Sequence, residues 1–348
     1  MVGSDIHIRK EGLAGRITLS RPDALNALTY DMIIAIEDIL AIWAKDDGVH
    51  LVLIDGEGRA FCAGGDIQEL YDTGMAGDFE FGRKFWADEY RLNAAIANFL
   101  KPFVALVDGI VMGGGVGIAC HGSHRIVTEN TMLAMPESAI GLIPDVGGSF
   151  LLSQAPGFTG EYLAATGARL NAFDAIYAGF ADIYVNSERL EELVRVLVHT
   201  GDAGVIEKFS DRPEPGFLKQ QQETLKRCFA QGDAAEIAAA LDAEMDAENS
   251  EWAKKQAKTM RRNCPISVAC AIEIVRRCRK LSRIEDALAL EYRFSYRSMS
   301  DGELLEGIRA QIIDKDRNPN WKIADLGSVG LKEIEYMLAP LGDQELQL

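Results

Sequence analysis

The chain has 348 residues, a formal charge of −17 at pH 7, and 48% hydrophobic and 26% charged residues. This composition is typical of a globular protein with a core of its own. The negative charge argues against nonspecific nucleic-acid binding, which depends on neutralising phosphates. The apolar runs are all shorter than the roughly 18–20 residues that cross a bilayer. Neither nucleic acid nor a membrane is therefore expected as a partner.

The amino-terminal segment and the cysteines bear on the compartment. MVGSDIHIRKEGLAGRITL has neither the basic and apolar regions of a secretory signal nor the Arg- and Ser-rich composition of a transit peptide, so we expect a cytoplasmic location. Six cysteines at irregular spacing, without a C-x-x-C pair, predict reduced core thiols. His121 and His124 lie close in sequence, but no third ligand follows at a suitable spacing, so no metal is expected.

The first half of the chain alternates strand-like and helical segments. Strands are predicted over 6–10, 15–20, 50–56, 102–109, 124–129 and 131–137. Helices are predicted from Thr29 to residue 47, from about Asp66, and over 113–122. Such alternation indicates an α/β fold with helices packed on sheets.

From about Gly160 the pattern is almost wholly helical. Helices are predicted over 161–167, 171–179, 187–200, 217–231, 234–245, 251–263, 266–280 and 283–299. The clearest linker signal is DRPEPG at 211–216. We therefore predict an α/β core over residues 1–205 and a helical carboxyl-terminal region over residues 206–348.

Two glycine-rich turns, FCAGGD at 61–66 and MGGGVG at 112–117, each follow an apolar strand and precede a helix. Glycine there permits positive φ and lets a ligand approach the backbone. Exposed amide N–H groups at a helix start favour negative charge, so two such turns that converge would form an oxyanion hole. Neither turn matches a Rossmann or P-loop fingerprint. Tight packing is the alternative interpretation for each turn alone.

The segment MPESAIGLIPDVGG at 135–148 places Glu137 and Asp145 among apolar and turn-forming residues. A carboxylate with apolar neighbours risks desolvation, which raises its pKa and suits proton transfer or nucleophilic attack. The structural alternative is that Glu137 merely follows a strand end and that Asp145 caps a helix opening at Val146–Gly147.

Ten basic residues lie between 254 and 283, and within that range only Glu273 opposes them. They are Lys254, Lys255, Lys258, Arg261, Arg262, Arg276, Arg277, Arg279, Lys280 and Arg283. An acidic protein with one basic stretch suits a polyanionic small ligand. The alternative is that these residues form the solvated faces of helices.

With these motifs together, the sequence resembles the enoyl-CoA hydratase/isomerase (crotonase) superfamily. The matching segments are RPDALNAL (21–28), AFCAGGDI (60–67), KPFVALVDGIVMGGGVGIA (101–119) and MPESAIGLIPDVGG. The resemblance implies a crotonase-like spiral of strand–helix turns, here with an extended α-helical carboxyl-terminal portion. It also implies an acyl-CoA substrate, no cofactor beyond the CoA carried by that substrate, and leaves a homo-oligomer open.

The resemblance also implies roles for individual residues. The amides of Gly65 and Gly114 would hold the thioester carbonyl oxygen, and Glu137 would attack it or activate water. Asp145 would orient a substrate hydroxyl or take part in proton transfer. Substrate contacts are expected from Glu89, Gly64, Asp66 and Gly113. CoA contacts are expected from Arg21, Lys315 and the basic stretch.

One departure narrows the expected activity. Hydratases of the superfamily use two glutamates, and the position of the first is taken here by Gly117. The segments DEYRLN (88–93), EYRFSYR (291–297) and IDKDRNPNW (313–321) resemble instead the branch that hydrolyses 3-hydroxyisobutyryl-CoA in valine breakdown, with 3-hydroxypropionyl-CoA as a further substrate. Alternatives are an enoyl-CoA isomerase or hydratase of fatty-acid oxidation, and a noncatalytic acyl-CoA-binding subunit.

Overall fold

The computed structural model describes residues 5–246 and 249–348, so the first four residues of the amino-terminal segment considered above lie outside it. The chain divides into two compact units. A sheet unit comprises Met1–Asp66, Asp88–Ala134 and Arg169–Gly216, and a helical unit comprises Ile67–Ala87, Met135–Ala168 and Phe217–Leu348. These units interleave along the chain. The division into 1–205 and 206–348 concerns contiguous segments and stays a prediction.

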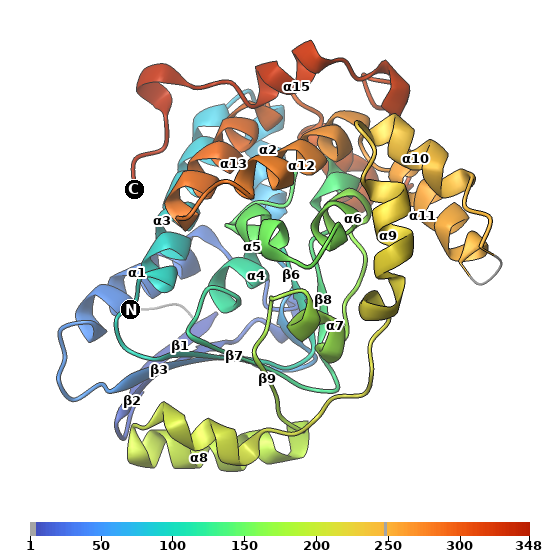
Figure 1. Cartoon of the computed structure of the whole chain (residues 1–348). Coiled ribbons are helices and arrows are strands. Elements are labelled where there is room, and N and C mark those ends of the chain that lie inside the picture. Colours follow the sequence, from blue (N-terminus) through green and yellow to red (C-terminus); the bar gives the residue numbers. More distant parts are fainter. Residues whose placement is uncertain (1–4, 247–248) are drawn as a thin grey trace. The chain divides into compact units, whose positions relative to one another are not determined.

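The sheet unit is built on a six-stranded sheet in the order β1-β2-β3-β5-β7-β9 (Figure 1). Its strands are β1 (Ile6–Glu11), β2 (Ala14–Leu19), β3 (Leu51–Gly56), β5 (Phe103–Val107), β7 (His124–Val127) and β9 (Ile183–Tyr184). β1 and β2 pair antiparallel, and the remaining neighbours pair parallel. Parallel strands joined through helices confirm the predicted α/β class.

Helices cover both faces of this sheet. Alternate residues of β3 and β5, such as Leu53 and Val104, pack with Leu193 and Leu197 of α8 (Leu190–Thr200), which crosses one face in Figure 1. Each leucine buried in this way contributes about 1.5–3 kcal/mol. On the other face lies α1 (Tyr30–Trp43), whose start at Thr29 is confirmed because the Thr29 side chain accepts a hydrogen bond from the Met32 amide.

A second, three-stranded parallel sheet in the order β4-β6-β8 also belongs to the sheet unit. Its strands are β4 (Ala60–Cys62), β6 (Ile110–Met112) and β8 (Met132–Ala134). β4 and β6 were not predicted from the sequence, because three residues are too few for a periodic pattern. Parallel strands end at the same edge of a sheet, so the glycine turns that follow β4 and β6 leave the sheet side by side.

The helical unit holds most of the remaining helices. They include α2 (Ile67–Met75), α5 (Gly148–Gln154), α6 (Thr159–Thr166), α9 (Gln222–Phe229), α10 (Ala234–Asp242), α11 (Ser250–Arg262), α12 (Pro265–Cys278), α13 (Ile284–Ser298), α14 (Leu304–Ile308) and α15 (Leu331–Met337). The shorter α4 (Gly114–Ala119) and α7 (Ala172–Tyr177) belong to the sheet unit, and α3 (Phe79–Ala97) is divided between the units at Asp88. None of the helices in the described part of the chain combines the length and apolar content that crossing a membrane requires.

Candidate active site

The two glycine turns lie against each other in the sheet unit. Gly64 has φ +117° and Gly113 has φ +49°, conformations that favour glycine. A Cβ atom built on Gly64 would lie 3.5 Å from the Met112 carbonyl oxygen and 4.0 Å from the Gly114 nitrogen. The structure therefore brings together the predicted residues Gly64, Gly65, Gly113 and Gly114.

Gly114 lies at a position where a Cβ atom would meet close neighbours. A Cβ atom there would lie 2.6 Å from Glu89 Oε1, 3.3 Å from the Gly65 nitrogen and 3.4 Å from Leu28 Cδ1. Real Cβ atoms almost never approach other atoms within 3.0 Å. Three groups predicted separately, the Gly65 amide, Gly114 and Glu89, thus meet at one point of the sheet unit.

The amide N–H groups of Gly65 and Gly114 are available as donors. The Leu28 amide donates to the Gly64 carbonyl, and the Leu28 carbonyl accepts from the Asp66 amide. Gly65 lies between these two hydrogen bonds, and its N–H takes part in neither. Gly114 is the first residue of α4, where an amide has no acceptor within the helix. Among the described residues, neither amide donates a hydrogen bond.

Glu89 lies on α3 and is 3% exposed, so its carboxylate does not lie on a solvated helix face. The thiol of Cys62, at the end of β4, is fully buried. Burial raises its pKa to about 12, and the Glu89 charge also raises it. Cys62 is therefore no nucleophile at neutral pH.

Asn93 was missed by our sequence analysis. It lies one helical turn beyond Glu89 on α3, is fully buried, and neither atom of its side-chain amide has a hydrogen-bond partner among the described residues. Buried polar groups are normally paired, so a water or a ligand is the natural partner. The spacing of Glu89 and Asn93 in DEYRLN was the signal that could have identified it.

Arg21 and Asp66, two predicted site residues, form an ion pair. Arg21 Nη2 lies 3.0 Å from Asp66 Oδ2, and Arg21 Nη1 donates to the Ala27 carbonyl at 2.5 Å. The pair links the RPDALNAL segment to the residue after the first glycine turn. Asn26 of the same segment holds the start of β4 by donating to the Glu57 and Ala60 carbonyls at 2.9 and 2.8 Å.

Glu137 is 5% exposed and begins the short turn of helix η2 (Glu137–Ile140) in the helical unit. Three helices hold this turn. Ser138 Oγ donates to the Ala164 carbonyl of α6 at 2.8 Å, and the Cys264 amide before α12 donates to the Ser138 carbonyl at 2.9 Å. Gly307 of α14 packs directly on the Ile140 backbone. Glu137 thus has a fixed backbone and little contact with solvent.

Asp145 is 4% exposed and precedes a turn with unusual backbone angles. Val146 has φ +55° and Gly147 has φ +77°. The N-cap residue of α5 is Gly147, so Asp145 does not occupy the capping position of that helix, and its backbone carbonyl accepts from the Gly148 amide at 2.7 Å.

The carboxylate that binds the start of α5 belongs to Glu291 of α13. The sequence did not identify Glu291 as a site residue. Its Oε2 accepts from the Gly147 amide at 2.8 Å, and its Oε1 accepts from the Ser149 amide at 3.0 Å and from Ser149 Oγ. Burial raises the pKa of the Glu291 carboxyl to about 8, the hydrogen bonds lower it, and the Asp145 charge raises it. EYRFSYR was quoted for its resemblance, but nothing in sequence links it to residue 147.

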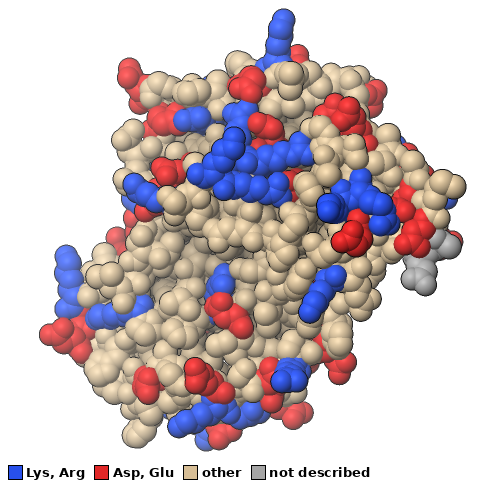
Figure 2. All heavy atoms as spheres, viewed as in Figure 1, with Lys and Arg blue, Asp and Glu red and all other residues tan. Residues whose placement is uncertain are grey.

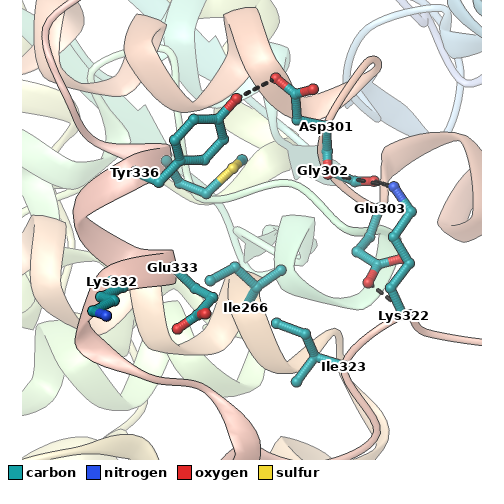
Figure 3. Close-up of a pocket in the computed structure, with 10 residues that line it drawn as sticks. Ile266, Asp301, Gly302, Glu303, Lys322, Ile323, Lys332, Glu333 and Tyr336 are labelled. Carbon is teal, nitrogen blue, oxygen red and sulfur yellow. Dashed lines mark hydrogen bonds between the residues drawn. The ribbon is translucent and has the colours of Figure 1, made fainter.

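A pocket of about 350 Å³ lies elsewhere in the helical unit, beside α15 (Figure 3). Its polar groups bond to one another: Tyr336 donates to Asp301 at 2.9 Å, and Lys322 Nζ donates to the Gly302 carbonyl at 2.8 Å. Glu303 accepts from the Lys322 amide at 2.7 Å, and burial raises its pKa. None of the predicted site residues lines this pocket.

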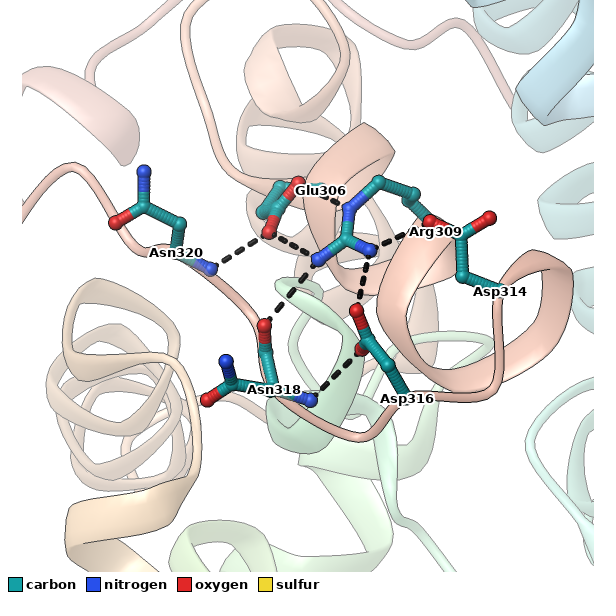
Figure 4. A network of polar contacts seen from close by, with 6 residues as sticks. All are labelled: Glu306, Arg309, Asp314, Asp316, Asn318 and Asn320. Carbon is teal, nitrogen blue, oxygen red and sulfur yellow. Dashed lines mark hydrogen bonds and ion pairs between the residues drawn. The ribbon is translucent and has the colours of Figure 1, made fainter.

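Lys315 lies in a loop organised by Arg309 (Figure 4). Arg309 binds Glu306, Asp314 and Asp316 at 2.8, 2.6 and 2.8 Å. The acidic residues around Lys315 are thereby occupied, and the hydrogen bond from Arg309 lowers the pKa of Asp316. Lys315, with φ +56°, is exposed and makes no ion pair with the described residues.

The basic stretch 254–283 is partly neutralised. Five of its arginines form ion pairs, and all of their acidic partners except Glu273 lie outside the stretch. The pairs are Arg261 with Asp242, Arg276 and Arg279 with Glu161, Arg277 with Glu273 and Glu335, and Arg283 with Glu285. Figure 2 shows the basic side chains of one face in several clusters, most with acidic neighbours. These contacts occupy the five arginines within the protein and favour a structural role for them over contact with a polyanionic ligand.

All six cysteines are free and buried, which confirms the predicted reduced thiols. Within residues 5–246 and 249–348, no cluster of three or more His, Cys, Asp or Glu side chains could hold a metal ion.

Comparison with known sequences gives a family and close relatives. The model of a family described as enoyl-CoA hydratase/isomerase matches residues 14–338. A relative from Danio rerio named "3-hydroxyisobutyryl-CoA hydrolase, mitochondrial" is 38% identical over 358 aligned positions, covering 99% of this chain and 92% of the relative.

Solved structures agree on the fold. An enoyl-CoA hydratase from Rhodobacter sphaeroides is 48% identical with a TM-score of 0.94, covering 99% of this chain and 100% of the other. A carnitinyl-CoA dehydratase from Mycobacterium thermoresistibile is 41% identical with a TM-score of 0.93, covering 99% of both chains. Both align over the carboxyl-terminal helices as well as the sheet, which confirms the crotonase-like fold with its helical extension.

The predicted cytoplasmic location is wrong by the same comparison. The vertebrate relatives are named as mitochondrial hydrolases, which points to mitochondria instead. The prediction relied on the absence of a leader-like composition near the start of the sequence, and such an absence does not determine a compartment.

Proposed function

The chain belongs to the enoyl-CoA hydratase/isomerase family, and from that premise we propose that it hydrolyses the thioester of a 3-hydroxyacyl-CoA, with 3-hydroxyisobutyryl-CoA as the preferred substrate. The products are the free hydroxy acid and CoA, a step of valine breakdown. The observation that carries the proposal is the juxtaposition of two available amides, Gly65 and Gly114, with the buried carboxylate of Glu89.

The two amides are proposed to form the oxyanion hole. When the carbonyl carbon becomes tetrahedral, its oxygen gains negative charge, and two fixed N–H donors stabilise that charge without reorganising. Both donors are main-chain groups at the ends of adjacent strands, so their separation is set by strand pairing. The side chain that residue 114 lacks leaves room for the thioester oxygen.

Glu137 is proposed to deliver the attacking oxygen. As a general base it takes a proton from water, the water oxygen bonds to the carbonyl carbon, and the C–S bond then breaks to release CoA thiolate, which accepts a proton. As a nucleophile its carboxylate attacks the same carbon, the C–S bond breaks to release CoA thiolate, which accepts a proton, and water hydrolyses the resulting mixed anhydride. The low exposure of Glu137 suits either role, because desolvation strengthens a carboxylate base or nucleophile.

These two routes differ in the fate of the water oxygen. In a single turnover in ¹⁸O-labelled water, a mixed anhydride cleaved at its enzyme carbonyl leaves label in Glu137, while direct attack leaves all label in the product acid. Label found by mass spectrometry in the peptide that contains Glu137 therefore identifies the mixed-anhydride route.

Glu89 and Asp145 are proposed to contact the 3-hydroxyl group. A carboxylate that accepts a hydrogen bond from a substrate hydroxyl rejects analogues that lack it, because the carboxylate is then buried without that partner. Glu89 is suited to this role by its burial beside Gly114. Gly64, Gly113 and the ion pair of Arg21 with Asp66 complete the proposed substrate contacts.

Lys315 is proposed to contact a phosphate of CoA. It carries an unpaired charge on a loop whose acidic groups are bound to Arg309. Among the basic residues of 254–283, those outside the observed ion pairs, such as Lys254 and Lys258, remain candidates for the same role. The CoA moiety arrives with the substrate, so no other cofactor is proposed.

Hydration of an enoyl-CoA is the second candidate, because the structure with 48% identity is named an enoyl-CoA hydratase. Against it, the first of the two hydratase glutamates is replaced by Gly117, a buried residue of α4. A glycine supplies no proton, so water addition across a double bond lacks one acid–base partner.

Free-thiol release from 3-hydroxyisobutyryl-CoA, measured beside loss of the double bond of crotonyl-CoA, tests the proposal. Rapid thiol release without double-bond loss is expected. Double-bond loss without thiol release would make the protein a hydratase. Exchange of the α-hydrogen without either reaction would make it an isomerase, and tight binding without turnover would make it an acyl-CoA-binding subunit.

A further inference from the structure

Glu291 and the Asp145–Gly147 turn form a unit that the proposed chemistry leaves unexplained. Val146 is β-branched and 1% exposed, yet it has φ +55°. A β-branched residue in the left-handed region is a steric outlier, and such residues persist only where the surroundings over-determine the backbone. The residue before it is Asp145, one of the two buried carboxylates of MPESAIGLIPDVGG.

One buried side chain, that of Glu291, binds the backbone directly after Val146. Glu291 is fully buried, and its two oxygens bind the amides on either side of Gly148, those of Gly147 and Ser149, at 2.8 and 3.0 Å. Ser149 Oγ donates to the same carboxylate and contacts Cys278 Sγ of α12 at 3.3 Å. α5 has no local side-chain cap, so Glu291 provides from 144 residues away what a neighbouring Asp or Ser normally provides.

We propose that Glu291 is a positioning residue: its carboxylate clamps the amides of Gly147 and Ser149, keeps Val146 in the left-handed conformation, and thereby fixes the direction of the Asp145 carboxylate. The proposal rests on the proposed function in so far as Asp145 takes part in the reaction. It adds a role for the carboxyl-terminal helices, which supply the clamp through α13.

A glutamine at 291 cannot reproduce the clamp. The amide side chain has only one acceptor oxygen, so its NH₂ group faces the N–H of either Gly147 or Ser149. Both of these groups are donors, so one of the two hydrogen bonds is lost. The matched control is Glu161→Gln. Glu161 is also fully buried and in the helical unit, but it pairs with Arg276 and Arg279 and makes no hydrogen bond to the 145–149 turn.

The first measurement is independent of any activity. Hydrogen–deuterium exchange of the peptide over 145–151 is expected to accelerate in E291Q and to stay at the wild-type rate in E161Q. Unchanged exchange in E291Q would overturn the clamp whether or not the protein hydrolyses a thioester.

The second measurement separates positioning from general stability. Using 3-hydroxyisobutyryl-CoA, E291Q is expected to lower kcat by about 10²-fold with KM within about threefold of wild type, because small misplacements of a reacting group affect the transition state most. E161Q is expected to keep kcat within about threefold. Equal losses in the two variants would overturn the positioning role, whereas a wild-type protein without thiol release would overturn only the proposed function.

Val146→Gly provides an internal check, because glycine adopts φ +55° without steric cost. If Glu291 acts by holding this conformation, V146G should restore kcat of E291Q by roughly fivefold or more, within the range of couplings between contacting residues. Strictly additive effects would contradict the proposal. Should E291Q fail to fold, Ser149→Ala removes one hydrogen bond of the clamp and is expected to lower kcat by about three- to tenfold. An S149A kcat equal to wild type would overturn it.

Discussion

The glycine turns of the sheet unit and the 135–149 segment of the helical unit place reactive groups in different ways. In the turns, the groups are backbone amides, and two neighbouring parallel strands, β4 and β6, set their separation. In the 135–149 segment, the groups are the side chains of Glu137 and Asp145. Their backbone is held by α6, α12, α13 and α14 through single contacts such as those of Ser138 and Glu291.

The difference concerns what each arrangement tolerates. Where strand pairing sets the positions of the amides, those positions stay the same when side chains change, provided that no side chain fills the space at the turn. Carboxylates placed by distant helices depend on particular partners, so a change far away in sequence can move them.

Changing the attacking group itself should have the largest effect. Glu137→Gln keeps the shape of the side chain but removes the base or nucleophile. We expect kcat to fall by about 10³–10⁴-fold while binding of the substrate stays within about threefold, because the amides that hold the carbonyl are unchanged. Single-turnover thiol release and calorimetric binding measure the two quantities. Glu69→Gln, an exposed carboxylate of α2, is the control and should behave as wild type.

Near-normal turnover of E137Q would refute the assignment of Glu137. Loss of binding together with turnover would instead mean that Glu137 supports the fold of η2 more than the chemistry.

Filling the space between the amides should have the next largest effect. In Gly114→Ala the new methyl group would lie 2.6 Å from Glu89 Oε1 and 3.3 Å from the Gly65 nitrogen. The glutamate can swing away, so folding should survive, but the carbonyl pocket is blocked. We expect kcat/KM to fall by about 10²–10³-fold, as for removal of an oxyanion-hole donor. Gly327→Ala, which meets only Asp325 at an ordinary 3.4 Å, is the control. A fully active G114A would remove Gly114 from the site.

The two halves also differ in how far their sequence predicts them. Thr29 and the apolar spacing after it predict the start of α1, and glycine before a helix predicts both turns. β4 and β6 were missed because three residues carry no period, so the family resemblance, and no local pattern, indicated that the turns are neighbours. Glu291 was missed because a buried carboxylate in a helical pattern looks like any other glutamate until its partners, 144 residues away, are known. Local signals predicted the elements, and tertiary contacts decided which groups meet.

The burial of Glu291 predicts a smaller, pH-dependent effect on stability. The pKa of Glu291 is raised from its ordinary 4.5 to about 8, with burial as the first cause, so the folded state binds a proton that the unfolded state has lost. The stabilisation from this proton is complete below pH 4.5 and is lost as the pH rises through about 8. Across that window the free energy of unfolding should fall by about 1.4 kcal/mol per pH unit relative to E291Q. The groups facing Glu291 are Asp145, Ser149 and Cys278.

Urea denaturation of wild type and E291Q at several pH values measures this difference. A wild-type advantage that grows with pH would mean that the Glu291 carboxyl is ionised in the folded state throughout, with its hydrogen bonds from Gly147 and Ser149 outweighing burial.

The smallest expected effect concerns Lys315, whose loop belongs to neither half of the comparison. An exposed lysine near a phosphate contributes about 0.2–1 kcal/mol and is screened by salt. Lys315→Ala should therefore raise KM for the acyl-CoA by roughly two- to fivefold, leave kcat unchanged, and weaken the rise of KM with salt.

Lys208→Ala, at an exposed lysine of the sheet unit, is the matched control because it removes the same charge from the same acidic protein. If K208A raises KM as much as K315A, net charge rather than contact governs CoA binding. If neither variant changes KM, the ordered loop around Arg309 is structural, and the phosphate contacts lie among the unpaired lysines of 254–283.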